Sequence, residues 1–337
     1  MNLSIPGINS TVPAILSLCL FSTTVYPTTV YPDSYEDCLN ILLREGDDSL
    51  TLADIRQQCR INADPEPDDN IIEHRVQEEE ETRDNRFTLT PHRPNYLLPL
   101  SYNKSPNIAP FEQNIKNFSS TEIKFQLSVK APLAEGVFNG YGDIYVAYTN
   151  TSWWQAYNEN SAPFRETNHE PEVFMVLPTD YQFFGFDMNM VAAGFTHQSN
   201  GRSGELSRSW NRLYAQFIFS KGNFVASIKP WWRIPEPEKE PGEENSSKGD
   251  DNPDIEKYMG YGELHLGYQI QEHNLGMMLR NNLRSDNKGA VQLDWSFPIN
   301  RRFRGYIQYF NGYGESLIDY NDSANRLSVG VMLTDWL

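Results

Sequence analysis

The sequence of 337 residues lacks any apolar run of the ~18 residues that a membrane-spanning helix needs. Its longest apolar stretch, residues 12–21, is too short to cross a bilayer and is typical of a signal-peptide core. No lysine or arginine precedes this stretch, since the first is Arg44, so either the terminal amine supplies the positive end or the start is assigned imperfectly. We therefore predict a signal peptide within residues 1–33.

Cysteine is scarce as well, with three residues in the whole chain. Cys19 falls in the predicted signal, which leaves Cys38 and Cys59 flanking two short helix-like segments. In an oxidising compartment a disulfide between them would close a loop of roughly twenty residues and contribute about 3 kcal/mol. The alternative is two unrelated thiols. We predict a small helical hairpin over residues 34–61.

Basic residues are too few to balance the acids, and the net charge is −17. The excess is local, because residues 62–84 carry a net charge of −8 and residues 236–254 one of −6. Acid-rich segments poor in aromatics stay solvated, and they argue against nucleic-acid binding. Calcium capture by these runs is a weaker alternative, since neither has the alternating ligand spacing of a calcium loop. We predict an acidic linker over residues 62–93.

Beyond residue 94 the chain consists of short alternating segments separated by turn residues. Twelve antiparallel strands are expected, an even number that brings both ends of a closed sheet to the same side. We therefore predict an all-β fold, a twelve-stranded antiparallel transmembrane β-barrel over residues 94–337. The expected strands are residues 94–102, 122–132, 139–152, 170–177, 184–199, 207–220, 223–234, 258–270, 273–284, 288–298, 302–312 and 325–336.

A soluble β-sandwich shows the same alternation, so the membrane prediction depends on further features. The turns alternate between tight ones, at 134–136, 221–222 and 271–272, and long ones, at 153–169, 200–206, 235–257 and 312–324. Short periplasmic turns and longer external loops are typical of outer-membrane barrels. Aromatic residues at strand ends favour a membrane girdle: Trp153, Trp154, Trp231, Trp232, Tyr258 and Trp336.

The segment around residues 195–214 carries the most informative chemistry. His197 and Ser199 are two apart, so they share one face of a strand, and Asn211 ends the apolar face of the next strand. In a barrel this face meets lipid, and its end lies at headgroup level. Serine, histidine and asparagine can serve as nucleophile, general base and orienting group. The simpler interpretation is three polar residues that cap strands and bond to backbone.

Longer motifs favour the catalytic interpretation. The run from His197 through Arg202 and the segment at residues 207–214 resemble outer-membrane phospholipase A, the bacterial detergent-resistant phospholipase A1 family. The resemblance covers residues 94–337 and includes the segments 161–168, 252–255, 257–261 and 312–320. It implies a serine hydrolase of the bacterial outer membrane with catalytic residues His197, Ser199 and Asn211.

The resemblance also implies a calcium ion. Its ligands would be the main-chain carbonyl of Arg202, the hydroxyl of Ser207 and, from a partner subunit, the hydroxyl of Ser161. Neutral oxygen ligands suit a loosely bound calcium ion. A second calcium site would use Asp251, but this chain has Gly204 where the family has an aspartate, so Glu205 would have to substitute.

Two further roles are expected for single residues. The backbone N–H of Gly201 would stabilise the oxyanion. Asn150 falls on the lipid-facing side of its strand and matches a glutamine in the dimer interface of the family. Because a polar amide facing lipid is costly unless it pairs, Asn150 would meet its copy across a two-fold axis. A contact with an interfacial loop is the alternative.

Together these features predict calcium-dependent hydrolysis of phospholipid and lysophospholipid acyl esters in the outer leaflet, by a homodimer. The alternatives are a porin and an adhesin that uses the acidic segment 235–257. A porin would conduct through a polar lumen, yet the expected lumen residues mix charges, as a filled interior does: Arg208, Arg212, Gln216, Lys229, Glu263 and Arg304.

Overall fold

The computed structural model describes residues 89–111, 115, 117–240, 249–300 and 303–335, together with residues 72 and 75. The chain divides into units 1–66 and 67–337, and every described residue belongs to the second. The predicted signal peptide, the helical hairpin with its two cysteines and Trp336 lie outside the described residues.

Twelve long strands and one two-residue strand make up this unit. They are β1 (Thr90–Pro91), β2 (Asn95–Asn103), β3 (Thr121–Ala134), β4 (Asp143–Trp154), β5 (Phe164–Phe183), β6 (Phe186–Ser199), β7 (Ser209–Lys221), β8 (Phe224–Arg233), β9 (Gly262–Ile270), β10 (His273–Asn281), β11 (Gly289–Pro298), β12 (Arg304–Tyr313) and β13 (Ser323–Thr334). The described helices are short: η1 (Ala109–Phe111), η2 (Gly204–Leu206) and α4 (Ile255–Met259). Among the described residues, no helix is long and apolar enough to cross a membrane.

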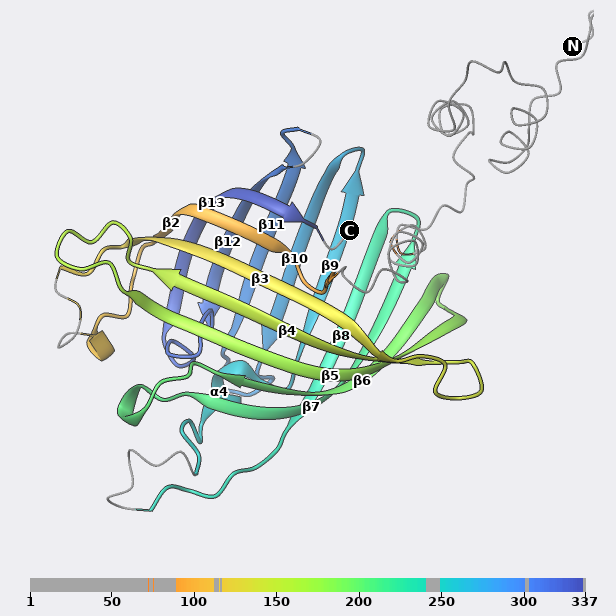
Figure 1. The fold of residues 1–337 in the computed structure, drawn as a ribbon, viewed down its shortest axis with the longest axis horizontal. Coiled ribbons are helices and arrows are strands. Elements are labelled where there is room, and N and C mark those ends of the chain that lie inside the picture. The colour runs from red at the N-terminus through yellow and green to blue at the C-terminus, as the bar shows by residue number, and fades with distance from the viewer. Residues whose placement is uncertain are drawn as a thin grey trace, which may run out of the picture. The chain divides into compact units, whose positions relative to one another are not determined.

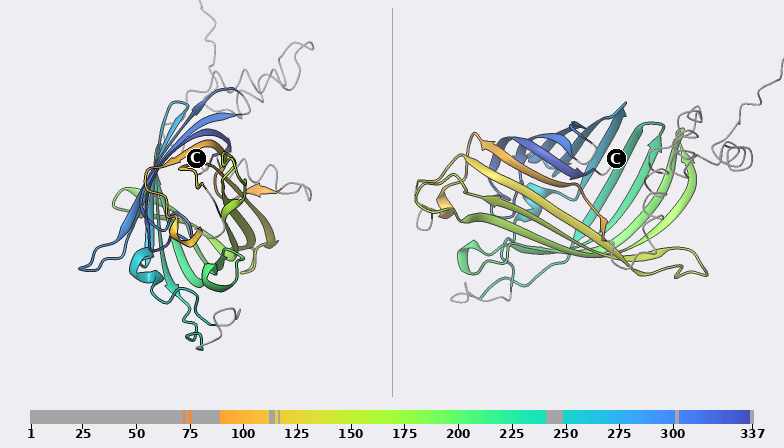
Figure 2. Two further views of the ribbon diagram at one scale, coloured as in Figure 1. Left: turned by 90° about the vertical axis from the view of Figure 1, so that its left-hand side faces the viewer. Right: turned by 45° about the horizontal axis from the view of Figure 1, so that its top comes forward.

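The strands close into a barrel (Figures 1 and 2). Each long strand pairs antiparallel with its neighbours in sequence, and β13 pairs with β2 to complete the circle. Closure leaves no long strand with an unpaired edge, which is what a sheet surrounded by lipid requires. The prediction of a closed twelve-stranded antiparallel barrel is confirmed.

The largest differences from the predicted strand ranges are at three places. β5 spans 20 residues instead of the expected 170–177, so the preceding loop is shorter than 153–169. The turn expected at 134–136 is an eight-residue connection, residues 135–142. Residues 258 and 259 belong to α4, not to a strand, because Gly260 ends the helix with φ of 65° before β9 begins.

The two ends of the barrel have connections of different length, as predicted. The tight turns at 184–185, 222–223 and 271–272 lie at one end, and the connection 200–208 between β6 and β7 lies at the other. The longest connection, residues 234–261 between β8 and β9, is also at that second end. We call it the long-loop end.

Successive side chains of each strand point alternately to the outside and to the inside of the barrel. The outside is apolar and the inside is polar. On β7, Leu213 is 46% exposed while its neighbours Arg212 and Tyr214 are buried. Alternation corrects the predicted girdle, because two adjacent tryptophans cannot both face lipid. Trp232 is 57% exposed, whereas Trp231 and Trp153 are buried inside the barrel. Tyr258 does not belong to a strand-end girdle either, since it lies in α4.

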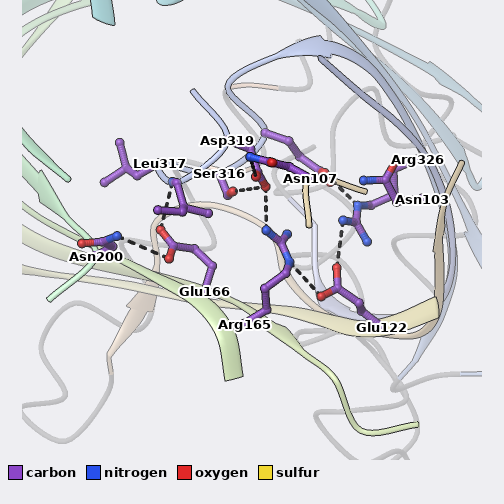
Figure 3. Close-up of polar contacts among 12 residues, drawn as sticks. Asn103, Asn107, Glu122, Arg165, Glu166, Asn200, Ser316, Leu317, Asp319 and Arg326 are labelled. Atoms are coloured by element: carbon purple, nitrogen blue, oxygen red, sulfur yellow. Dashed lines mark hydrogen bonds and ion pairs between the residues drawn. The ribbon is translucent and has the colours of Figure 1, made fainter. Parts of the chain in front are cut away.

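A cluster of ion pairs fills the barrel near the long-loop end (Figure 3), and we call it the mouth network. Glu122 accepts hydrogen bonds from Arg165 at 2.8 Å and from Arg326 at 2.9 Å. Arg326 also pairs with Glu315 at 2.7 Å, and Glu315 with Lys124 at 3.0 Å. Asp319 completes the network at 2.6 Å from Arg165. Acids and bases are equal in number, so the buried charges compensate one another.

The connection between β12 and β13 folds over this network. Leu317 and Ile318 are almost completely buried, and their backbone N–H groups donate to Asn168 Oδ1 at 2.9 Å and Glu166 Oε1 at 3.1 Å. A second set of paired charges lies deeper, where Arg212 meets Glu170 at 2.9 Å. The interior is therefore filled by side chains in place of an open lumen.

Some residues of the predicted linker, residues 62–93, contact the barrel. β1 pairs with β3, and His92 Nε2 lies 2.8 Å from Glu172 Oε1 inside the barrel. Farther upstream, Ile72 packs on Val225, and Arg75 donates to the main-chain carbonyl of Asp335 at 2.8 Å.

Candidate functional site

His197 and Ser199 lie within the last three residues of β6, at the long-loop end. They lie on the same outward side of the strand as Ala193 and Phe195, while Thr196, which precedes His197, is buried inside. Both side chains are half-buried. The barrel therefore presents an imidazole and a hydroxyl to the outside, at the depth where its apolar surface ends.

Asn211 lies directly across from His197 in the β6–β7 register. Its Oδ1 is 2.9 Å from His197 Nδ1. An amide oxygen only accepts, so Nδ1 donates and Nε2 remains unprotonated as the base. This is the tautomer that proton abstraction from a serine needs.

Ser199 is two residues along the same face from His197. Within the described part of the chain, no hydrogen bond joins Ser199 Oγ to His197 Nε2. Such contacts between nucleophile and base are often long in unliganded enzymes and tighten when substrate is bound. The structure thus brings together the three residues predicted from the sequence, with one of the two hydrogen bonds of a triad formed.

Ser199 belongs to a row of outward polar residues that crosses four strands. Asn150, His169, Ser199 and Ser209 are successive cross-strand partners on β4 to β7, and we call them the outer polar row. His169 Nδ1 lies 2.6 Å from Tyr148 Oη and 3.3 Å from Asn150 Nδ2. The amide of Asn150 is thus paired within its own chain.

His169 is the residue at this site that sequence reasoning missed. The predicted strand began at residue 170, which left His169 in a loop with no defined face. In the structure it belongs to β5 and is the cross-strand partner of Ser199. A closer reading of the alternation upstream of residue 170, where Thr167 and His169 alternate with buried Glu166 and Asn168, could have found it.

The connection after Ser199 is shaped by Asn200 and Gly201. Asn200 is buried, its Oδ1 accepts from the N–H of Arg208 at 3.0 Å, and its Nδ2 donates to the carbonyl of Leu206 at 2.8 Å. Gly201 has φ of 64°, a left-handed conformation that favours glycine. Among the described residues nothing accepts a hydrogen bond from the Gly201 N–H, so this donor is available two residues beyond Ser199.

The candidate calcium ligands lie in the same connection. The Arg202 guanidinium donates to the main-chain carbonyls of Phe164 and Arg165, and it lies 3.4 Å from the carboxylate of Glu166. Ser207 Oγ donates to Asp251 Oδ2 at 2.8 Å. Ser161 is exposed in the β4–β5 loop, and within one chain no hydrogen bond joins it to Ser207 or Arg202.

The donor chemistry around Ser207 fits calcium, because it consists of hydroxyl, carbonyl and carboxylate oxygens. Ser209 Oγ also contacts Asp251 Oδ2, at 3.3 Å, while Lys239 Nζ lies 2.5 Å from the other carboxylate oxygen. Gly204 has φ of 65°, and Glu205, which would have to substitute for the aspartate, is exposed in η2. Within the described ranges, no group of three or more His, Cys, Asp or Glu residues could hold a metal.

Comparisons with known proteins identify the family of this chain. A family model described as Phospholipase A1 matches residues 72–333. Phospholipase A1 of Escherichia coli K12 is 42% identical over 270 residues, covering 79% of this chain and 87% of its own. A calcium-bound dimer of the Salmonella typhi outer membrane phospholipase is 40% identical with a TM-score of 0.69, covering 76% of this chain and 96% of its own. An asparagine-to-alanine active-site mutant of the E. coli outer membrane phospholipase A is 41% identical with a TM-score of 0.67, covering 75% and 95%.

Proposed function

Because this chain belongs to the phospholipase A1 family of the bacterial outer membrane, we propose that it hydrolyses phospholipid and lysophospholipid acyl esters through Ser199, His197 and Asn211. The observation that carries the proposal is the 2.9 Å contact between His197 and Asn211, with Ser199 on the same outward face. These three residues lie on the outside of the barrel, where the ester bond of a membrane phospholipid can reach them.

In the first step, His197 Nε2 takes the Ser199 proton as Oγ attacks the ester carbonyl. The tetrahedral intermediate then collapses, the imidazolium donates its proton to the departing lysophospholipid alcohol, and the acyl group stays on Ser199. Asn211 holds the Nδ1–H bond and keeps the imidazole in place. In the second step His197 activates a water molecule, which releases the fatty acid and restores the hydroxyl.

The negative charge on the carbonyl oxygen needs a donor close to Ser199. The unpaired N–H of Gly201 supplies one in our proposal, since a free backbone donor beside the nucleophile matches the requirement of an oxyanion hole.

Calcium would be held by the carbonyl of Arg202, the hydroxyl of Ser207 and the hydroxyl of Ser161 from a partner subunit. When bound, it supplies positive charge that stabilises the developing oxyanion. The need for this positive charge is greater with Asn211 than with an aspartate, because an amide carries no charge to balance the imidazolium. The calcium-bound Salmonella dimer supports this part of the proposal.

Dimerisation follows from the same ligand set. Ser161 makes no contact with Ser207 in its own chain, so a second barrel would complete the cation site. Asn150, in the outer polar row, would lie at this interface, where it already pairs with His169.

The porin alternative is disfavoured by the interior. The mouth network and the buried loop residues Leu317 and Ile318 occupy the space that a solute would cross. The interior charges are paired, as they are in a rigid plug and not in a conducting channel.

The proposal is tested by fatty-acid release from phospholipid in mixed micelles, with calcium against chelator. We expect release that depends on calcium and disappears in Ser199→Ala. Release that ignores both the chelator and the serine substitution would contradict the proposal.

A further inference from the structure

The third residue of the triad is neutral, and the structure shows what orients it. Asn211 Nδ2 donates to Glu236 Oε1 at 2.8 Å. We propose that Glu236 is a positioning residue that fixes the Asn211 amide, so that hydrogen bonds connect His197, Asn211 and Glu236 in series behind Ser199. This inference rests on the proposed function of the triad and adds to it a residue from the acidic segment after β8.

The argument begins with the two ends of one amide group. An asparagine side chain can be turned by 180° so that its oxygen and nitrogen exchange places at little steric cost. An ionised carboxylate only accepts hydrogen bonds. Glu236 therefore selects the orientation in which Nδ2 faces it, and Oδ1 must then face His197.

The orientation of the amide decides the tautomer of the imidazole. With Oδ1 toward His197, Nδ1 must carry the proton, and the lone pair of Nε2 faces the nucleophile side. In the opposite orientation, Nδ2 would donate to Nδ1, and the proton would move to Nε2, where it blocks the base. Glu236 thus disfavours an inactive arrangement that Asn211, unlike an aspartate, permits.

The backbone holds Glu236 at this place. The N–H of Ile234 donates to the carbonyl of Asn211 at 2.8 Å, so the segment leaves β8 alongside the triad residue. Pro235 and Pro237 flank Glu236 and restrict φ on both sides. The carbonyl of Pro237 accepts from the N–H of Asp250 at 2.8 Å, which ties down the other side of the segment.

Glu236 also restores part of the charge that the triad lacks. It is half-buried, and its negative charge lies one hydrogen-bonded group from the imidazole. Through the polarised amide it favours the imidazolium that forms when Ser199 is deprotonated.

Steady-state hydrolysis in calcium-containing mixed micelles tests the inference with Glu236→Ala, Glu236→Gln and the control Glu238→Ala. Glu238 is the next acid in the segment and is exposed. We expect Glu236→Ala to lower kcat about ten-fold, the size of one hydrogen bond to a charged group, with KM unchanged. Glu236→Gln should recover part of the loss, because its amide oxygen still accepts, and Glu238→Ala should match wild type.

A double-mutant cycle shows whether Glu236 acts through Asn211. In an Asn211→Ala background, Glu236→Ala should change kcat less than two-fold, since the group that it orients is gone. An equal loss in both backgrounds would assign Glu236 a merely structural role, and full activity of Glu236→Ala in the wild-type background would also overturn the inference.

A readout independent of activity separates this inference from the proposed function. The ¹⁵N shifts of labelled histidine report the tautomer of His197, identified by the signal lost in His197→Gln. We expect the Nδ1–H form in wild type and a mixture in Glu236→Ala. An unchanged tautomer would refute the role of Glu236 even in an active enzyme, whereas retained hydrolysis in Ser199→Ala would refute the triad and leave the tautomer result standing.

Discussion

The mouth network and the outer polar row are two polar clusters at the same end of one barrel. The first lies inside the barrel and the second outside, and β5 contributes to both through Arg165 and His169. Inside, Glu122, Arg165 and Arg326 are almost completely buried and each is matched by charged partners. Outside, Ser199 of the outer polar row is half-buried, and so are His197 and Asn211 beside it, which share one hydrogen bond.

The difference follows from the surroundings of each face. Enclosed charges are stable only when they are compensated, so the acids and bases of the mouth network pair with one another. The outer face meets the boundary of the membrane, where neutral polar groups cost less. There the Gly201 N–H has no acceptor among the described residues, which is what the proposed oxyanion donor requires. The inner face therefore stabilises the barrel, and the outer face carries the proposed catalytic residues.

The largest expected effect is on the reactive face. Ser199→Ala should lower hydrolysis by about 10³-fold or more, because the nucleophile is lost and nothing replaces it. The barrel should remain folded, since the hydroxyl is on the surface and takes no part in packing. Fatty-acid release together with heat-modifiable migration on gels measures both. Activity above a few per cent of wild type would place the nucleophile elsewhere.

A substitution inside the barrel, in the mouth network, should lower stability and leave activity unchanged. Arg326→Met removes the partner of Glu122 and Glu315 and leaves buried carboxylates less compensated, which should cost about 3–5 kcal/mol of unfolding free energy. Denaturant unfolding in detergent measures it, with Arg284→Met as the control in an exposed pair with Asp286. Activity per folded molecule should not change. A variant as stable as wild type would show that the mouth network does not support the barrel.

The interior should also be sensitive to acid. Burial alone would raise the pKa of Glu315, but the charges of Arg326 and Lys124 outweigh it and lower the pKa from 4.5 to about 2. A lowered pKa in the folded state adds stability that is complete above pH 4.5 and is lost as the pH falls toward 2, about 3 kcal/mol for this group. Unfolding measured at several pH values should therefore show a weaker decline in Glu315→Gln over this range. Parallel declines would contradict the assignment.

Asn211→Ala sharpens the comparison on the outer face. Its loss should lower kcat by about 10²-fold, less than the serine substitution, because the base remains while its orientation is weakened. Kinetics of purified protein in mixed micelles measure the ratio. If Asn211→Ala were as inactive as Ser199→Ala, its role would be larger than that of an orienting group.

The alternation of each strand could be predicted from the sequence, and with the turn lengths it led to the barrel. It placed His197 and Ser199 on one face, whereas their assignment to a triad with Asn211 depended on the family resemblance. Alternation could not give the partners across the interior. Arg165 and Asp319 are far apart in sequence, and their contact depends on how the β12–β13 connection folds inward. Both Trp231 and Trp232 were predicted in the girdle, although the alternation of a strand lets only one of them face lipid.

Two residues beside the triad were beyond the sequence prediction for different reasons. His169 depends on where β5 begins, and polar residues around residues 164–170 resemble a loop until their interior partners are known. Glu236 belongs to an acidic run whose general property is solvation. Only the contact between the β8 exit and Asn211 distinguishes it from Glu238.

The smallest expected effect concerns the partner barrel. If calcium is bound by Ser161 of one subunit and by Arg202 and Ser207 of the other, a monomer has an incomplete cation site. Ser161→Ala should then raise the calcium concentration for half-maximal activity about five-fold, while Asn160→Ala, an exposed neighbour, should not.

The shared calcium site can also be tested through the dimer fraction, because ligand binding and dimerisation are thermodynamically linked. Ligands that bind only the dimer must favour dimerisation, so calcium and a substrate analogue together should raise the dimer fraction more than either alone. Sedimentation in detergent micelles measures that fraction, and Ser161→Ala should weaken the calcium contribution. Full activity at dilutions where only monomer exists, with a dimer fraction indifferent to both ligands, would refute the shared site. The outer polar row would then act within a single barrel, because its hydrogen bonds among Asn150, His169 and Tyr148 need no second subunit.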